Sequence, residues 1–222
     1  MEEKTGALRE RLFALAVGGR LAVAFSGGLD SRFLAHTAAR LGLSPLLLHA
    51  VGPHMARAES RFARGWAAAR GLELRLLEIN PLKEPEVAAN GRQRCYHCKR
   101  ALFSLLKEAA SGLALCDGTQ ASDSGAYRPG LAALRELKIV SPLADCGLSK
   151  PEIRRLAAET GMESPEQRAR PCLLTRFAYG LSPPPAQLAA PDQADDATDA
   201  FLAQAARTAA RPARGAFRLR WL

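Results

Sequence analysis

The segment that most constrains the fold is residues 21–31, LAVAFSGGLDS, an apolar run that leads directly into a Gly-rich turn and then a helical pattern. An apolar run bounded by turn residues predicts a buried strand, and a helix that begins directly after it leaves several backbone N–H groups unpaired. These groups and the positive end of the helix dipole suit an anion such as a phosphate chain. The two glycines let a ligand approach the backbone, and the two serines add hydroxyl donors. We therefore predict a phosphate-binding turn, with a simple helix cap by Ser26 or Asp30 as the alternative.

The rest of the chain alternates apolar runs with helical patterns. We expect strands at 20–25, 44–52, 72–80, 113–119 and 138–143, and helices at 4–17, 32–41, 56–71, 96–110, 130–137 and 149–161. This alternation predicts an α/β fold, a doubly wound parallel sheet of about five strands with helices on both faces. Ligands bind such sheets at the carboxyl ends of the strands, where the loops 26–31, 49–54 and 117–124 fall. The last helix should begin with a capping box formed by Ser149 and Glu152.

The composition indicates one hydrophobic core, because the chain has 222 residues of which 48% are hydrophobic. From residue 181 the sequence changes to a Pro cluster and an Ala- and Asp-rich stretch, so we divide the chain into 1–180 and 181–222. No run is long enough to span a membrane and no signal peptide precedes the first helix. We therefore expect a cytoplasmic protein.

The net charge of +9 raises the question of a polyanionic partner. Arginine supplies most of the positive charge, and the chain is also rich in alanine. This combination is typical of a general bias in amino-acid composition. No block of Lys and Arg with interleaved aromatic residues appears. The sequence therefore favours an anionic small-molecule substrate over a nucleic acid.

The cysteines suggest a metal or catalytic role, since disulfides are rare in the cytosol. Cys95 and Cys98 form a C-x-x-C pair at a helix start, a position that lowers the pKa of a thiol. With Cys172 as a third ligand, the set suits a four-iron cluster whose remaining iron holds an added sulfide. A structural zinc ion would need His97 or Cys116 as the fourth ligand, and a redox pair would need neither. Cys116 and Cys146 are expected to be core or loop thiols.

The turn SGGLDS resembles the pyrophosphatase loop of the PP-loop ATPases, which cleave ATP between its α and β phosphates. A wider resemblance covers about 20–180 and is carried by VAFSGGLDS, RCYHCKRALF, LCDGTQASDSGAYRPGLAALREL, SPLADCGLSKPEIRRLA and PCLLTRFAYG. These segments, in this order, resemble the LarE family of ATP-dependent sacrificial sulfur transferases, which help to build the nickel-pincer nucleotide cofactor. The resemblance implies a Rossmann-like fold of the adenine nucleotide alpha hydrolase type. We also expect a homo-oligomer.

The resemblance further implies a reaction. ATP and Mg²⁺ adenylate a carboxylate of pyridinium-3,5-biscarboxylic acid mononucleotide, and pyrophosphate leaves. A sulfur nucleophile then displaces AMP and leaves a thiocarboxylate. Some members use one sacrificial cysteine, which corresponds to Cys172, and others hold a [4Fe-4S] cluster with three cysteines, which correspond to Cys95, Cys98 and Cys172. Because all three are present, we favour the cluster form.

Individual residues can be given roles on this basis, each with a plainer alternative. The residues expected to bind ATP are Ser26, Gly27, Gly28, Asp30, Ser31 and Asp117. The residues expected to take part in catalysis are Cys172, Asp30, Ser31, Lys99 and Arg176, and those expected to bind the substrate are Arg128, Arg218 and Arg220. Asp30 either holds Mg²⁺ or caps the helix, Asp117 is otherwise a turn residue, and Arg128 otherwise pins its loop. Lys99 and Arg176 are otherwise solvated surface cations.

The chain departs from the family in three places. Ala126 stands where an aspartate is usual, and MESPEQRARP replaces a W-D-K-like stretch. The segment 181–222 reads as a Pro/Ala-rich linker and the remnant of a smaller, truncated C-terminal substrate domain. Two other functions stay open: a PP-loop tRNA thiolase, which the basic charge suits, and a degenerate module that binds a nucleotide or a cluster without catalysis.

Overall fold

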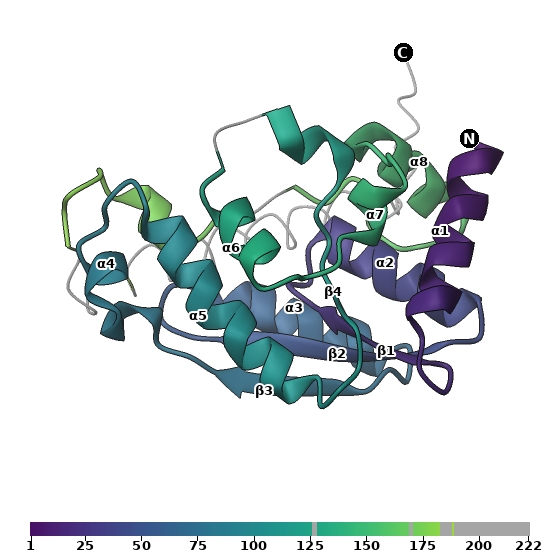
Figure 1. The fold of residues 1–222 in the computed structure, drawn as a ribbon, viewed down its shortest axis with the longest axis horizontal. Helices are drawn as coiled ribbons and strands as arrows, with labels where there is room; N and C mark the ends of the chain where they lie inside the picture. Colours follow the sequence, from purple (N-terminus) through teal and green to yellow (C-terminus); the bar gives the residue numbers. More distant parts are fainter. Residues whose placement is uncertain (126–127, 169–170, 183–187, 189–222) are drawn as a thin grey trace, which may run out of the picture.

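The computed structural model describes residues 1–125, 128–168, 171–182 and 188, and within them the chain forms a parallel four-stranded sheet. The strands are β1 (Arg20–Ala24), β2 (Ser44–Val51), β3 (Leu74–Glu78) and β4 (Leu115–Cys116), in the order β3-β2-β1-β4 (Figure 1). In the register, Val23 of β1 lies opposite Leu47 of β2 and Cys116 of β4. The chain adds β2 and β3 on one side of β1 and then crosses over to add β4 on the other side, as in a doubly wound fold.

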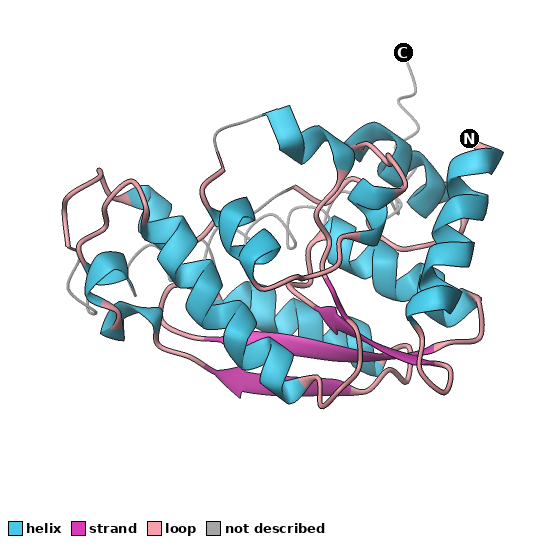
Figure 2. Ribbon diagram, viewed as in Figure 1, coloured by secondary structure: helices cyan, strands magenta, loops and turns pink. Residues whose placement is uncertain are grey.

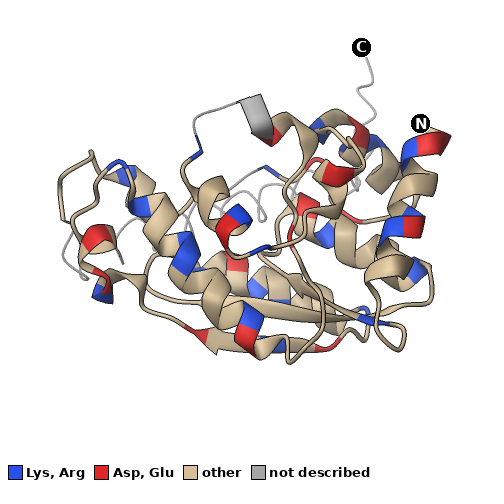
Figure 3. Cartoon of the chain, viewed as in Figure 1, with Lys and Arg blue, Asp and Glu red and all other residues tan. Residues whose placement is uncertain are grey.

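Helices surround the sheet (Figure 2). They are α1 (Glu2–Leu15), α2 (Leu29–Arg40), α3 (Arg57–Ala68), α4 (Pro85–Ala88), α5 (Arg94–Ala109), α6 (Gly130–Glu136), α7 (Pro142–Asp145) and α8 (Lys150–Glu159). The described residues also form 3₁₀ turns at Pro81–Lys83, Ala121–Gly125 and Leu173–Arg176. Charged residues lie mainly on the helices and loops, and the strands carry few (Figure 3).

Two separate cores show that both faces of the sheet are covered. Leu21 and Val23 of β1 pack into one core with residues of α1, α2, α3 and α8. Ala22, between them in β1, packs into the other core with residues of α5 and α6. Successive side chains of a strand point to opposite faces, so this division follows from the alternation along β1. Each fully buried Leu contributes about 1.5–3 kcal/mol to stability. The prediction of a doubly wound α/β fold is confirmed.

The prediction of a fifth strand at 138–143 is wrong in its length. Only an isolated parallel bridge between Cys116 and Val140 forms there. Pro142 has no N–H to donate to a ladder and instead occupies the first turn of α7. The fourth strand is also shorter than 113–119, because Asp117 leaves the ladder to form a turn with Thr119.

The capping box at the start of α8 is confirmed, and it also ties α8 to the N-terminal helix. The backbone N–H of Ser149 donates to Glu152 Oε2 over 2.8 Å. Lys4 Nζ donates to both oxygens of the Glu152 carboxylate, over 2.8 and 3.0 Å. The hydrogen bond from Lys4, with those from Ser149, lowers the pKa of Glu152 to about 2. This link therefore stays charged at all ordinary pH values.

The expected second segment, 181–222, lies outside the described residues except for 181, 182 and 188. Across the described part of the chain, no helix has the length and apolar character that a membrane span requires.

Candidate functional site

A cavity of about 560 Å³ opens at the carboxyl ends of the strands. Its walls come from the loops after β1, β2 and β4, from the first turn of α2, and from α5 and α6. The expected site residues that line it are Ser26, Gly28, Asp30, Ser31, Cys95, Lys99, Asp117 and Arg128. Most of the residues predicted from separate motifs therefore meet around one space of a size that suits a nucleotide-like ligand.

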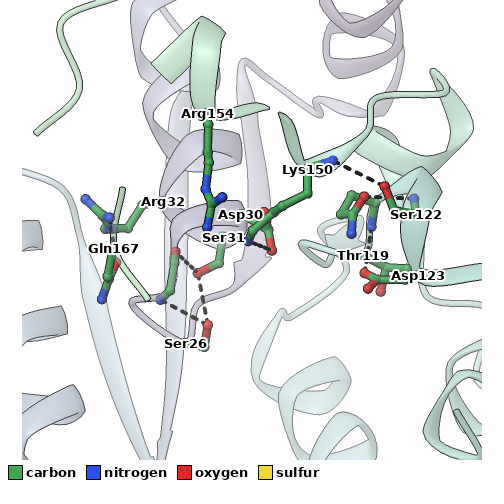
Figure 4. Close-up of polar contacts among 12 residues, drawn as sticks. Ser26, Asp30, Ser31, Arg32, Thr119, Ser122, Asp123, Lys150, Arg154 and Gln167 are labelled. Atoms are coloured by element: carbon green, nitrogen blue, oxygen red, sulfur yellow. Dashed lines mark hydrogen bonds and ion pairs between the residues drawn. The ribbon is translucent and has the colours of Figure 1, made fainter. Parts of the chain in front are cut away.

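The turn between β1 and α2 is held by its own serines (Figure 4). The Gly28 N–H donates to Ser26 Oγ over 3.2 Å, the two serine hydroxyls lie 3.1 Å apart, and Ser31 Oγ donates to the Gly28 carbonyl over 3.1 Å. The cap residue of α2 is Gly28, with no side-chain cap hydrogen bond. The alternative in which Ser26 or Asp30 caps the helix is therefore wrong, and the N-terminus of α2 faces the cavity as an anion site would.

Gly27 and the loop after β4 show how tightly this turn is built. Gly27 has a φ of +79°, a backbone conformation that residues other than glycine rarely adopt. A Cβ at this position would lie 3.0 Å from Ala63 Cβ. A Cβ on Gly118 would lie 2.8 Å from the backbone nitrogen of Ser31 and 3.1 Å from the carbonyl carbon of Asp30. The two loops can therefore approach this closely only because residue 118 has no side chain.

Asp30 forms an ion pair that the sequence did not indicate. Lys150 Nζ, in the first turn of α8, lies 2.7 Å from both oxygens of the Asp30 carboxylate (Figure 4). Burial raises the pKa of Asp30, and the hydrogen bond and charge of Lys150 act against that rise. Lys150 thus offsets part of the cost of burying the Asp30 carboxylate at the edge of the cavity. Its segment, SKPEIRRLA, is predicted to be a capped helix and is part of the family resemblance, but nothing in the local pattern places it beside residue 30.

Asp117 is a buried loop organiser as well as a cavity residue. Its carboxylate accepts hydrogen bonds from Thr119 Oγ1, from the Thr119 N–H and, over 2.7 Å, from Ser141 Oγ. The plainer alternative, in which Asp117 shapes the turn before Gly118, is therefore confirmed. Its place in the cavity wall leaves a role in binding ATP as a proposal.

Two expected cations line the cavity. The Arg128 guanidinium pairs with Asp123 over 2.6 Å, and its side chain is 52% exposed. Lys99 Nζ lies 5.8 Å from the centre of the Phe103 ring, and a Cβ on Gly130 would meet the Lys99 side chain at 2.7 Å. Arg128 thus pins its loop while facing the cavity, and Lys99 is fitted closely against α6.

The three expected sulfur ligands lie in one region of the fold. Cys95 and Cys98 are in the first turn of α5 and Cys172 directly precedes the 3₁₀ turn at Leu173–Arg176. Cys98 and Cys172 pack against the same apolar cluster, which includes Val87, Leu173 and Leu174. Cys116 and Cys146 instead belong to the core around α1 and α8, as expected for structural thiols.

The expectation of a lowered thiol pKa at the helix start is wrong for Cys98. Burial raises its pKa to about 12, and the neighbouring thiols of Cys172 and Cys95 add to the rise. Burial likewise raises the pKa of Cys172. The cost of burying a thiolate outweighs the favourable end of the helix dipole here.

The loop before Cys95 folds against the segment after Cys172. The side chain of Asn90 donates to the Ala178 carbonyl over 3.0 Å, and its backbone carbonyl accepts from the Gly180 N–H over 3.0 Å. The buried guanidinium of Arg94 bonds to Asn90 and lies 4.6 Å from the centre of the Tyr179 ring. The packing that a shared sulfur site requires is therefore present.

The three cysteines supply the soft thiol donors that an iron–sulfur cluster takes. In the described ranges, however, no three His, Cys, Asp or Glu side chains are grouped as metal ligands would be. The expected ligand set of Cys95, Cys98 and Cys172 is therefore not assembled at metal-ligand spacing, and a cluster remains a proposal.

The remaining expected residues lie outside the cavity wall or outside the described chain. Arg176 is exposed in the 3₁₀ turn after Cys172 and is not among the residues that line the cavity. Arg218 and Arg220 lie in the part of the chain that the structure does not describe.

Comparisons with known proteins find relatives that match about 72–73% of the chain. It is 35% identical over 165 residues to the uncharacterized protein slr1717 of Synechocystis, covering 72% of this chain and 62% of that protein. It is 31% identical over 163 residues to the uncharacterized protein MJ0830 of Methanocaldococcus jannaschii, covering 72% and 62%. It is 28% identical over 172 residues to the pyridinium-3,5-bisthiocarboxylic acid mononucleotide synthase of Lactiplantibacillus plantarum, covering 73% and 61%. The chain thus spans less than two thirds of the length of these relatives.

The fold also matches a solved structure. The NMN synthetase of Francisella tularensis superimposes with a TM-score of 0.57 at 15% identity, covering 76% of this chain and 73% of that one. No protein-family model matches the chain.

Proposed function

We propose that this chain, which resembles the LarE family and is 28% identical over 172 residues to a pyridinium-3,5-bisthiocarboxylic acid mononucleotide synthase, is an ATP-dependent sulfur transferase acting on a carboxylate of an anionic nucleotide. The coarser statement, a nucleotide-related enzyme that uses ATP, has the support of both the relatives and the fold. The finer one rests on a single observation: the phosphate-type turn and Cys95 line the same cavity, beside the segment that carries Cys172. The substrate proposed is pyridinium-3,5-biscarboxylic acid mononucleotide.

The first proposed step is adenylation. A substrate carboxylate oxygen attacks the α-phosphorus of ATP, and the bond to the β-phosphate oxygen breaks so that pyrophosphate leaves. The turn at Ser26–Ser31 and a Mg²⁺ ion held by Asp30 would stabilise the charge on the departing pyrophosphate. Lys99 and Arg128 line the same cavity and would balance the negative charge of the α-phosphate and of the substrate.

The second proposed step replaces oxygen by sulfur. In the sacrificial form, Cys172 loses its thiol proton, its sulfur attacks the acyl carbon, and AMP leaves with the electrons of the C–O bond. Loss of the Cys172 α-proton then breaks the Cβ–S bond, which leaves a thiocarboxylate on the substrate and dehydroalanine in the chain. In the form that we favour, Cys95, Cys98 and Cys172 would hold an iron–sulfur cluster that supplies a transferable sulfide. Arg176, close to Cys172 in sequence, and the undescribed Arg218 and Arg220 are proposed to contact the substrate.

The products of ATP test the proposal. With Mg²⁺ and the substrate, the protein is expected to release AMP and pyrophosphate. Asp30→Asn and Ser31→Ala should each lower the rate of pyrophosphate release by roughly tenfold or more, because each removes one oriented contact to developing charge. Release of ADP and phosphate, or unchanged rates in both variants, would contradict the assignment.

Lys150→Met should move the pH dependence of pyrophosphate release. Mg²⁺ binds the ionised carboxylate, and Lys150 lowers a pKa that burial raises. Without Lys150 the pKa of Asp30 rises further, so activity should be lost at a higher pH as the solution is acidified. Lys107→Met, which removes an exposed lysine of α5, is the matched control and should leave the profile in place. A Lys150→Met profile that overlays the native one would show that the ion pair does not set the ionisation of Asp30.

A further inference from the structure

Arg32 is a buried arginine directly behind the phosphate-type turn, and no step described above uses it. Its side chain is fully buried in α2, one residue after Ser31. The guanidinium donates to the Glu163 carbonyl over 2.6 Å and to the Ser164 carbonyl over 3.0 Å. It also donates to the side-chain oxygen of Gln167 over 2.5 Å (Figure 4). All three acceptors belong to the segment 163–167, which lies more than 120 residues away in sequence.

Burial of the Arg32 guanidinium costs free energy, and specific contacts offset that cost. The Phe62 ring lies 5.2 Å from its guanidinium carbon and covers it. Burial lowers the pKa of Arg32 to about 10, so the group stays charged at neutral pH. A buried charge is tolerated when hydrogen bonds compensate its burial, and three such bonds are made here although the Arg32 Nε has none. Ser164 also has a φ of +52°, a backbone conformation that the surrounding contacts must hold.

The segment that Arg32 holds leads directly to Cys172. Four residues, 168–171, lie between Gln167 and Cys172 along the chain. On the other side of Cys172, the Leu173 N–H donates to the His54 carbonyl over 3.0 Å, and Leu173 and Leu174 are buried. Cys172 therefore lies between two fixed points, and one of them is attached to the first turn of α2, the same turn that carries Asp30 and Ser31.

We infer that Arg32 is a positioning residue for the sulfur-transfer step, setting the place of Cys172 relative to the nucleotide. The inference rests on the proposed function and adds to it. Arg32 does not line the cavity, and its three hydrogen bonds all go to 163–167, so adenylation does not depend on it. Displacing a reacting group by about 1 Å can cost a hundredfold in rate, so loosening this segment affects sulfur transfer first.

The test separates the two half-reactions. In Arg32→Gln, pyrophosphate release with pyridinium-3,5-biscarboxylic acid mononucleotide should stay within about threefold of the native rate, while thiocarboxylate formed per pyrophosphate should fall roughly tenfold or more. Arg32→Lys should recover part of the yield, because an ammonium can reach some of the same carbonyls. Arg155→Gln, which removes an exposed arginine of α8, is the control and should change neither quantity.

A second measurement does not depend on the proposed activity. Alkylation of Cys172 by iodoacetamide, followed by mass spectrometry, should be roughly tenfold faster in Arg32→Gln, and alkylation of Cys146 should not change. Gln167→Ala removes a single contact and should shift both readouts in the same direction by a smaller factor, which keeps the test open if Arg32→Gln fails to fold.

The inference is overturned if pyrophosphate release and sulfur transfer fall together, or if Cys172 alkylation stays at the native rate in the folded variants. A native protein that releases no pyrophosphate at all contradicts the proposed function instead, and the alkylation result then still decides whether Arg32 holds the segment.

Discussion

Cys172→Ala is expected to abolish thiocarboxylate formation while pyrophosphate release continues. Cys172 is assigned to the sulfur site in both the sacrificial and the cluster form, so its loss removes the sulfur donor or one of its ligands. The groups proposed for adenylation lie elsewhere, in the turn after β1 and the loop after β4. Product analysis by mass spectrometry, beside a pyrophosphate assay, should show a loss of at least about a hundredfold in sulfur transfer, the scale expected when a nucleophile is removed.

Two further sets of variants, a control and a pair that separates the two forms, are needed to interpret this result. Cys146→Ala is the control, because Cys146 packs beside a different core, and it should transfer sulfur at the native rate. Cys95→Ala and Cys98→Ala separate the two forms. If both stop repeated turnover and remove the iron and colour of anaerobically purified protein, the cluster form holds. If neither matters and native Cys172 loses the mass of H₂S after one turnover, the sacrificial form holds. Sulfur transfer by protein with an intact Cys172 and no iron would contradict both.

Gly118→Ala is expected to lower pyrophosphate release by roughly a hundredfold. The added Cβ would lie 2.8 Å from the Ser31 nitrogen and 3.1 Å from the Asp30 carbonyl carbon. Both are backbone atoms, so no side chain can rotate away, and the loop after β4 must move relative to the turn proposed to bind phosphate. A displacement of about 1 Å at such a site costs on the order of a hundredfold in rate. Overpacking also costs about 1–3 kcal/mol of stability, so the melting temperature should fall by a few degrees.

Gly65→Ala provides the matched control. Gly65 lies inside α3, and a Cβ there would meet nothing within 4 Å. Alanine favours a helix over glycine by about 0.5–1 kcal/mol, so this variant should melt slightly higher and keep its activity. If Gly118→Ala binds Mg²⁺-ATP and releases pyrophosphate like the native protein, the two loops do not have to lie this close for catalysis.

Local patterns were enough to predict most of the fold. The apolar runs predicted five strands, of which four form in the described residues, and the turn and the capping box were predicted from residues a few positions apart. The failures came from competition between neighbouring signals. Val140 has the pattern of a strand, but Pro142 begins a helical turn two residues later and ends the pairing.

The site was predicted in its parts and not in its connections. Each motif identified one wall of the cavity, because motifs are local. The partner of Asp30 lies 120 residues away at Lys150, and the acceptors of Arg32 lie about as far. Neither Lys150 nor Arg32 lies in a sequence pattern that indicates burial of a charged residue. The sequence alone therefore predicts that both are surface cations. The high pKa of Cys98 has the same origin, since burial is decided by which distant segments cover the thiol.

The link between Lys4 and Glu152 determines when the fold can be completed during synthesis. These residues are 148 positions apart, and Leu8 and Leu12 of α1 share a core with Ile153 and Leu156 of α8. A ribosome adds about 5–20 residues per second, so the N-terminal helix waits on the order of 7–30 s before its partners exist. During that time its apolar stripe is exposed in the nascent chain. Helix α1 is therefore made long before α8 completes its packing, and a chaperone that binds short apolar helices has access to it during that interval.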